Sequence, residues 1–287
     1  MNKTAEKLIE TGLLVCALSC VITIFLIIVF ILAQGLPVIL KEGLVNFVTS
    51  SKWDPYYNLY GIFSMILGTF LVTILSLIIA LPMGLGCAML IAEVAPVRVR
   101  DVIRPAIETL AAIPSVIYGL FGLIVLVPFI REYLGGNGFS ILAGGIVLAI
   151  MILPTIISVS EDALRAVPRE LREGSLALGA TSWQVITGIV TPAALSGIVT
   201  GAVLAMGRSI GETMAVLMVC GNSTLVPTSI LDMVRPMTAA IALEWAYASG
   251  EHQNALFSIG VVLLIVIMIL NLIIYMANKK KINAERL

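Results

Sequence analysis

The sequence is poor in charge. Aspartate, glutamate, lysine and arginine make up 12% of its 287 residues, whereas 60% are hydrophobic and the mean hydropathy is +1.09. A soluble domain carries about 25% charged residues, so this composition excludes one and predicts a polytopic membrane protein. The seventeen basic and seventeen acidic residues cancel, so the chain lacks the overall positive field that attracts nucleic acid.

Residues that commonly build metal and catalytic sites are also scarce. There is one histidine, and the four cysteines (Cys16, Cys20, Cys87 and Cys220) show neither a C-x-x-C pair nor a Cys/His metal spacing. Because each cysteine lies in an apolar segment, we expect small buried hydrophobes, no metal site and no cofactor. No glycine is followed by lysine, which excludes a phosphate-binding P-loop and hence an ATPase site of its own.

Long uncharged runs are what the chain has instead. A membrane crossing takes about 20 helical residues, and runs of that length or more fall at 12–35, 61–92, 107–130, 139–160, 186–220 and 255–277. These predict an all-α membrane protein with six transmembrane helices. The second and fifth runs are overlong, which favours tilt or extension beyond the lipid. The first is longer than the apolar core of a secretory leader and lacks a cleavage site, so we interpret it as a retained span.

Basic residues alternate between the loops. One set of alternating segments holds most of them: Lys3, Lys7, Arg98, Arg100, Arg104, Arg165, Arg169, Arg172, Lys279, Lys280, Lys281 and Arg286. The other set holds Lys41, Lys52, Arg131 and Arg235. Because basic loops stay on the cytoplasmic side, this distribution predicts that both termini are cytoplasmic.

Helix breakers punctuate the inner spans. Pro82, Pro114 and Pro154 each lie within an apolar run, with glycines close to the first two, and we expect each proline to kink its helix. Prolines and small residues are ordinary in membrane helices, where they permit close packing. Their presence in consecutive spans favours bent helices lining a pathway over a rigid anchor.

The longest polar segment of the basic side, residues 161–185, contains a spaced motif. Glu173 is followed by Gly179 after six residues, by Ile189 ten residues later, and then by Pro192. This spacing resembles the EAA loop of ABC importer permeases, E-A-A-x3-G-x9-I-x-L-P. Gly174 and Ser175 stand in place of the two alanines, and Thr191 stands in place of the leucine.

The resemblance extends over most of the chain. The segments "ETLAAIPSVIYGLFGLIVLVPF", "GRSIGETMAVLMVCGN" and "ALFSIGVVLLIVIMILNLI" are similar to the phosphate-specific, PstC-type branch of these permeases. The resemblance implies the type I importer permease (MetI-like) fold, in a prokaryotic plasma membrane. It also implies that the loop docks onto an ATPase through a short coupling helix, with a tight turn at Gly179 and Ala180 that a side chain would obstruct.

The same resemblance implies partners and a domain plan. The expected partners are a second permease of the PstA type, two cytoplasmic ATPase subunits of the PstB type that bind the ATP, and an extracytoplasmic phosphate-binding protein of the PstS type. Residues 1–60 are then an N-terminal span with an external loop. Residues 61–278 form the core permease, with the coupling loop at 161–185, and residues 279–287 form a basic cytoplasmic tail.

Two opposite charges lie inside the fifth run, at Arg208 and Glu212. A charge near the bilayer centre costs from about 3 kcal/mol upwards, and a spacing of four places both residues on one helix face, close enough to pair. One hypothesis is therefore a structural salt bridge. The other is a substrate path, in which the guanidinium binds phosphate and Glu212 accepts a hydrogen bond from a protonated phosphate oxygen, which sulfate lacks at neutral pH.

Other functions stay open from the residues alone. The substrate could be a related oxyanion. An ion-coupled secondary transporter could use Glu212 as a proton carrier, although it leaves the EAA-like loop unexplained. An intramembrane enzyme has no histidine or metal set within the spans to support it. The external loop 221–254 contains "MTAAIALEWAYASG", which predicts a re-entrant or interfacial helix, and we assign no chemistry to its Glu244, Glu251 and His252.

Overall fold

The chain is almost entirely helical in a computed structural model, which describes the backbone of residues 3–284 and the side chains of residues 9–272. The basic residues of the expected tail at 279–287, together with Lys3 and Lys7, therefore lie outside the described side chains. Within the described part, six helical segments are long and apolar enough to cross a membrane: Ile9–Glu42, Phe63–Val94, Ser115–Tyr133, Ile141–Arg165, Ser182–Gly211 and Glu251–Leu272. The prediction of six spans is confirmed.

The first part of the chain is one long helix and a small hairpin. Helix α1 (Lys3–Glu42) is followed by α2 (Leu44–Thr49) and by two short antiparallel strands, β1 (Trp53–Asp54) and β2 (Leu59–Tyr60). Trp53 pairs with Tyr60 across the hairpin. The end of α1 packs on the first half of α13 (Glu251–Ala284), where Gly35 lies so close that a Cβ would come within 2.9 Å of the Phe257 backbone.

The remaining helices form the core. They are α3 (Phe63–Met89), α4 (Val97–Ala112), α5 (Ser115–Phe121), α6 (Val127–Tyr133), α7 (Ile141–Arg165), α8 (Arg169–Ala177), α9 (Ser182–Val185), α10 (Thr191–Gly211), α11 (Met214–Val219) and α12 (Met237–Glu244). Helix α7 is the centre, with 67% of its apolar window buried by its neighbours α3 and α10. Helix α1 is the opposite case, with 0% of its window buried, so its apolar surface faces lipid or another chain.

Three π-helical turns interrupt the spans, at Leu90–Val94, Gly122–Leu126 and Ile186–Val190. Each ends two residues before a proline, namely Pro96, Pro128 and Pro192. Proline has no N–H and its ring crowds the preceding turn, and a wider i→i−5 turn relieves that crowding. The proline pattern thus widens the helices rather than only bending them.

Two spans differ from the sequence prediction. The third begins at Ser115 and not near residue 107, because α4 is a separate amphipathic helix that ends at Ala112. Pro114 is the residue that caps α5, so it marks a break between two helices and not a kink within one. Pro82 and Pro154 do lie inside helices, in α3 and α7. The fifth span ends at Gly211, and α11 is a separate short helix.

The cysteine expectation is also corrected. Cys220 is buried, but Cys16, Cys20 and Cys87 are exposed on this chain. In a membrane protein an apolar side chain gains little by avoiding lipid, so apolarity does not predict burial within the chain.

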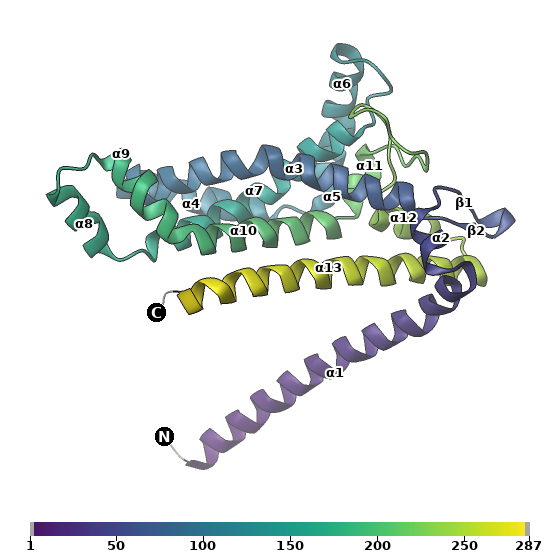
Figure 1. Cartoon of the computed structure of the whole chain (residues 1–287), viewed down its shortest axis with the longest axis horizontal. Helices are drawn as coiled ribbons and strands as arrows, with labels where there is room; N and C mark the ends of the chain where they lie inside the picture. Colours follow the sequence, from purple (N-terminus) through teal and green to yellow (C-terminus); the bar gives the residue numbers. More distant parts are fainter. Residues whose placement is uncertain (1–2, 285–287) are drawn as a thin grey trace.

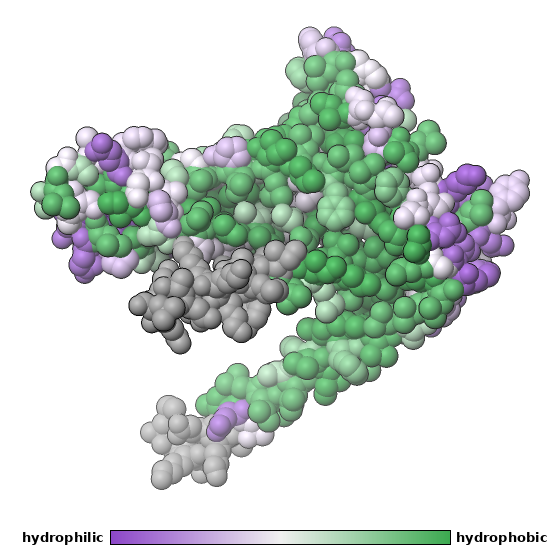
Figure 2. Space-filling view, in the orientation of Figure 1, coloured by the Kyte–Doolittle hydropathy of each residue, from purple (hydrophilic) through white to green (hydrophobic). Residues whose placement is uncertain are grey.

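The elements separate toward two ends of the molecule (Figure 1). Helices α8 and α9 lie at one end, which we call the α8 end, and α2 with the β1–β2 hairpin lies at the other, the hairpin end. The start of α1 and the end of α13 point toward the α8 end. Hydrophilic residues gather at both ends, while the surface between them is mostly hydrophobic (Figure 2), as expected for a chain that crosses a bilayer.

Candidate functional site

The EAA-like loop folds as a helix, a tight turn and a second short helix. Gly179 follows α8 with φ +90°, and its N–H donates to the Leu176 carbonyl at 3.0 Å, while the Ala180 N–H donates to the Ser175 carbonyl at 3.2 Å. These bonds close the helix end in the left-handed conformation that glycine adopts most readily. A Cβ at Gly179 would meet no atom within 4 Å. The expected obstruction inside the chain is therefore wrong, because the turn requires a backbone conformation and not empty space.

Apolar side chains cover the outside of this loop. Leu178 is 90% exposed and Trp183 is 66% exposed, and Leu171 and Leu176 are exposed as well. Val185 and Ile186 are instead buried inside the chain. The loop thus presents an apolar tip, Leu171, Leu176, Leu178 and Trp183, that nothing in the described chain covers. An exposed patch of this kind marks a surface for another protein or a membrane.

The other motif residues support this tip. Glu173 and Gly174 are exposed on α8, and the Ser175 hydroxyl donates to the Leu171 carbonyl at 2.6 Å. Ala180 packs against the small core below the loop. Ile189 lies in the third π turn and Pro192 lies in the first turn of α10. The spaced motif therefore marks one continuous corner that leads from α8 into the fifth span.

Arg172 fastens this corner to the spans. Its guanidinium donates to both carboxylate oxygens of Glu93, with Nη2 at 2.8 Å from Oε1 and Nε at 3.3 Å from Oε2. It also donates to the carbonyls of Leu164 and Val167 at the end of α7, at 2.7 and 2.5 Å. The two side chains are only 19% and 11% exposed. A forked, largely buried pair of this kind fixes orientation as well as distance, so α8 is fixed relative to α3 and α7.

The fifth span breaks at the charged pair. Helix α10 ends at Gly211, and Glu212 has extended backbone angles of φ −69° and ψ 134°. Arg208 lies in the last turn of α10, is exposed, and forms no ion pair with any residue that the structure describes. The expectation that Arg208 and Glu212 share a helix face and pair is wrong for this chain, because the helix ends between them.

Glu212 is held by neighbours on the other side of the break. Its Oε1 accepts a hydrogen bond from the Ala215 N–H at 3.2 Å, and its backbone carbonyl accepts one from the Thr238 hydroxyl at 2.6 Å. Ser209, next to Arg208, is buried and shares a hydrogen bond of 3.1 Å with Ser76 of α3. Neighbouring positions on a helix point in different directions, so anchoring Ser209 on α3 leaves Arg208 on another face.

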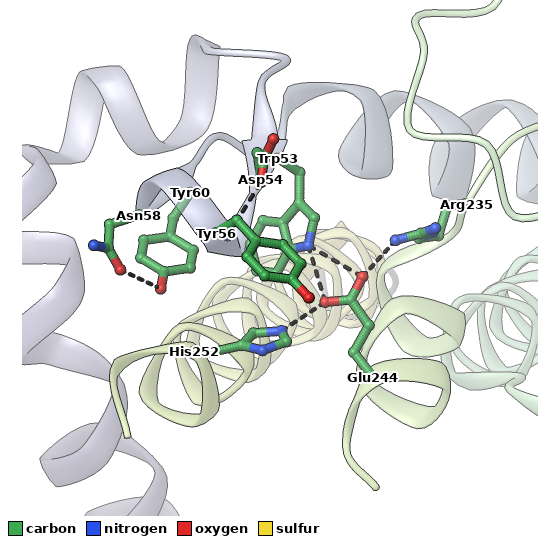
Figure 3. A network of polar contacts seen from close by, with 8 residues as sticks. All are labelled: Trp53, Asp54, Tyr56, Asn58, Tyr60, Arg235, Glu244 and His252. Carbon is green, nitrogen blue, oxygen red and sulfur yellow. Dashed lines mark hydrogen bonds and ion pairs between the residues drawn. The ribbon is translucent and has the colours of Figure 1, made fainter. Parts of the chain in front are cut away.

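A second buried carboxylate organises the hairpin end (Figure 3). Glu244, with its side chain 5% exposed, accepts from the Trp53 indole at 2.9 Å and from Arg235 at 2.5 Å, and lies 2.7 Å from Nε2 of His252. These residues come from β1, the loop before α12, α12 itself and α13. Glu244 therefore ties the hairpin to the helices behind it.

The pocket beside Glu244 contains two carboxylates that are each paired with a basic side chain, Glu244 with Arg235 and Glu251 with Lys41. It measures about 490 Å³ and is lined by Tyr60, Glu251 and His252 among others. Burial, together with the carboxylates of Glu251 and Glu42, raises the pKa of the Tyr60 hydroxyl above its usual range. No lysine or arginine is among the described residues that line this pocket, so it offers no free cation to an anion.

Comparison with known proteins places the chain. Residues 80–283 match the family described as "Binding-protein-dependent transport system inner membrane component". The chain belongs to this family. By that description its members are membrane components of a transport system, and the six spans agree with a multi-pass protein of the inner membrane.

Several curated permeases are similar over most of their length. The "Probable ABC transporter permease protein YqgH" of Bacillus subtilis (strain 168) is 44% identical over 98% of this chain and 93% of that protein. The "Phosphate transport system permease protein PstC" of Pasteurella multocida is 36% identical over 82% of this chain and 81% of its own. The protein of the same name from Xylella fastidiosa (strain Temecula1) is 39% identical over 77% of this chain and 75% of its own.

Solved structures share the fold at low identity. An alginate ABC transporter superposes with a TM-score of 0.66 at 18% identity, covering 97% of this permease and 99% of that chain. An inward-facing MetNI methionine ABC transporter superposes with a TM-score of 0.62 at 17% identity, covering 80% of this chain and 99% of that chain. The MetI-like fold expected from the EAA-like loop is therefore confirmed.

Two long-range contacts of this permease were not predicted from its sequence. Arg172 binds Glu93 from 79 positions away, and Trp53 binds Glu244 from 191 positions away. No local spacing reveals contacts of that range. The one available signal was that Glu93 and Glu244 border apolar runs, where an acidic residue needs a partner.

Proposed function

We propose that this chain is a permease subunit of an ATP-driven phosphate importer. The observation that carries the proposal is an exposed arginine, unpaired within the described chain, at a break in a membrane span. It occurs in a chain that resembles phosphate permeases over three quarters of its length or more. A guanidinium without a carboxylate partner is free to offer its fork to a tetrahedral oxyanion.

The break assigns different tasks to the two charges. Arg208 attracts the anion from the last turn of α10. Glu212 begins the next segment and keeps one oxygen, Oε2, that takes part in no described hydrogen bond, so it can accept one from a protonated phosphate. Its negative charge also weakens the hold of Arg208 on the anion. A pathway needs such weak binding, because an ion that is held tightly does not leave.

Energy reaches this pathway through the α8 end. The apolar tip docks into an ATPase subunit of the PstB type, and the Arg172–Glu93 contact carries the movement of α8 into α3 and α7. Arg208 is exposed on this chain, so a second permease of the PstA type completes the path around it. A PstS-type binding protein delivers phosphate from the other side. No part of this scheme requires a cofactor within the permease itself.

This scheme places the α8 end in the cytoplasm. The start of α1 and the end of α13 point toward the same end (Figure 1), which supports cytoplasmic termini and an external hairpin. Residues 1–60 then serve as a peripheral span and external hairpin, 61–278 as the core, and 279–287 as a cytoplasmic tail. In sealed cells a cysteine at Lys52 should react with an impermeant reagent, and one at Lys280 only after lysis. The reverse pattern would overturn this orientation.

The test of the function is reconstitution of the full complex. The tagged chain is copurified with the second permease, the ATPase and the binding protein, and is placed in liposomes that contain ATP. We expect phosphate uptake and ATPase stimulation that depend on the binding protein, with little response to sulfate. Equal transport of sulfate would indicate a general oxyanion permease. Uptake by the chain alone, driven by a proton gradient without ATP, would instead indicate a secondary transporter.

A further inference from the structure

A second polar pocket lies between the ends of α6 and α11. It measures about 570 Å³ and is lined by Arg131, Asn137, Phe139, Leu217, Gly221, Asn222 and Met233. Arg131 is the one charged residue in this lining, whereas the pocket beside Glu244 contains two carboxylates. Both carboxylates of the pocket beside Glu244 are paired with basic side chains, and no described lysine or arginine lines it. Of the two pockets, the Arg131 pocket is therefore the one that offers a cation to an anion.

The Arg131 side chain is only partly engaged. Its Nε donates to the backbone carbonyl of Asn137 at 3.2 Å, while neither terminal nitrogen takes part in any hydrogen bond or ion pair among the described residues. The bond at Nε holds the planar group at the pocket. The terminal nitrogens are the atoms that bind an oxyanion through two parallel hydrogen bonds.

Asn222 supplies a defined acceptor. Its N–H donates to the Val234 carbonyl at 3.1 Å, its own carbonyl accepts from Arg235 at 2.9 Å, and its Nδ2 donates to the Leu217 carbonyl at 2.8 Å. Because a carbonyl can only accept, the Nδ2 contact fixes which way the amide faces. The remaining atom, Oδ1, is buried and has no partner among the described residues. A buried acceptor left without a donor is costly. A small movement of the Asn222 side chain or of its cover would open Oδ1 to the pocket, where a ligand that carries a proton would satisfy it.

The backbone here is built for this arrangement. Gly221 and Asn222 both have positive φ, at +83° and +56°. A Cβ at Gly221 would come within 2.6 Å of the Met233 sulfur, so a side chain there would collide with the opposite wall. Glycine and asparagine are the residues that tolerate left-handed angles best. The Gly-Asn pair that follows "GETMAV" in the sequence therefore forms a wall of the pocket.

We propose that this pocket is an entry subsite for a protonated tetrahedral oxyanion, phosphate, on its way to Arg208. The inference rests on the proposed function. Arg131 attracts the anion, and Asn222 Oδ1, once uncovered, accepts a hydrogen bond from the P–OH group that phosphate carries and sulfate lacks. Helix α11 is six residues long, about 9 Å, and it joins the Arg131 pocket at Leu217 to Glu212 at the break. Phosphate therefore meets two arginine–acceptor sets in turn, first Arg131 with Asn222 and then Arg208 with Glu212.

The test uses protection of a cysteine in the reconstituted complex. Asn137→Cys places a thiol in the pocket, and it preserves the Arg131 contact because that contact is to the backbone. A neutral, impermeant maleimide reports access. The chain without this substitution gives the background, because it keeps the native cysteines, of which Cys16, Cys20 and Cys87 are exposed and Cys220 is buried. Ser249→Cys, in the pocket beside Glu244, is the matched control. Ionic strength is held constant with chloride.

We expect phosphate at about four times its dissociation constant to slow the labelling of Asn137→Cys by about fivefold. Phosphate should leave the labelling rate of Ser249→Cys unchanged. Sulfate should protect Asn137→Cys from labelling much less than phosphate does. Adding Arg131→Gln to the Asn137→Cys chain should abolish protection by phosphate. Asn222→Gly, which tolerates the positive φ, should make phosphate and sulfate protect alike.

The outcomes separate the subsite from the function. If phosphate does not slow labelling at Asn137→Cys while the same liposomes import phosphate, the subsite is wrong and the proposed function stands. If sulfate protects as well as phosphate in the chain with Asn222 intact, the role of Oδ1 is wrong. If no preparation imports phosphate, the proposed function fails first. Protection that survives Arg131→Gln would also overturn the inference.

Discussion

The α8 end and the break at Glu212 both combine arginine with glutamate, yet they are built in opposite ways. At the α8 end, Arg172 and Glu93 are largely buried and bound to each other through two hydrogen bonds. At the break, Arg208 is exposed and Glu212 is bound to its own segment. Satisfied charges make a rigid connection, whereas an unsatisfied charge is available to a ligand. In the proposed function, the rigid pair transmits movement and the unpaired charge meets the substrate.

The largest effect is expected from Gly179→Glu. Its left-handed angle of φ +90° costs about 1 kcal/mol or more for a residue with a Cβ, and the charge would sit within the apolar tip. We expect normal membrane insertion with uptake near background and loss of ATPase copurification. Gly174→Ala is the control, because Gly174 has no positive φ and a Cβ there meets no atom within 4 Å. Normal uptake by Gly179→Glu would remove the docking role of the loop.

Arg172→Ala tests the rigid half of the comparison. It leaves Glu93 largely buried without its partner and removes the bonds to the end of α7, a change that costs about 3 kcal/mol. We expect lower thermal stability of the complex, and ATPase activity that no longer responds to the binding protein. Arg169→Ala is the matched control on the same helix, since Arg169 is exposed. Equal stability of the two variants would show that the contact with Glu93 does not fasten α8.

Arg208→Lys tests the unpaired half. Lysine keeps the charge but loses the planar fork, so uptake per assembled complex should fall about tenfold, as expected for one lost charge-assisted hydrogen bond. The amount of complex should not change, because Arg208 holds no described ion pair.

A double substitution separates this role from a salt bridge formed only in the assembled complex. In that case Arg208→Ala or Glu212→Ala alone would reduce assembly, and the double alanine variant would restore both assembly and uptake. Full phosphate uptake by the double variant would make the pair a structural element and refute the substrate role.

Glu244→Gln is expected to have the smallest effect on transport. The amide keeps the shape but loses the charge that Arg235 and His252 face, and half of it becomes a donor directed at other donors. A loss of about 2 kcal/mol would lower the melting temperature by roughly 4 to 8 °C for a chain of this size, with uptake per complex unchanged. Glu251→Gln removes a carboxylate from the exposed pair with Lys41, and it should change the melting temperature little. A large loss of uptake at normal stability would give Glu244 a transport role.

Local sequence patterns were sufficient to predict the class of the protein and its spans. Few charges and long uncharged runs predict segments that lie in lipid. Such segments form helices, because in lipid every backbone polar group must be hydrogen-bonded within its own segment. The spacing of Glu173, Gly179, Ile189 and Pro192 located the corner at the α8 end, because a tight turn and a helix start depend on local residue types. Both features are local, and local patterns are what a sequence displays.

Which charges pair, in contrast, depends on how distant segments pack together. The sequence placed Arg208 and Glu212 on one helix face, but the helix ends at Gly211 and the Glu212 side chain accepts from the Ala215 N–H of the next helix. It gave no sign that Arg172 would bind Glu93, or that Asn222 would keep one unpaired oxygen beside Arg131. Whether a charge is satisfied depends on groups brought together from distant positions by packing. That packing sets the desolvation cost of each charge, and no spacing along the chain encodes it.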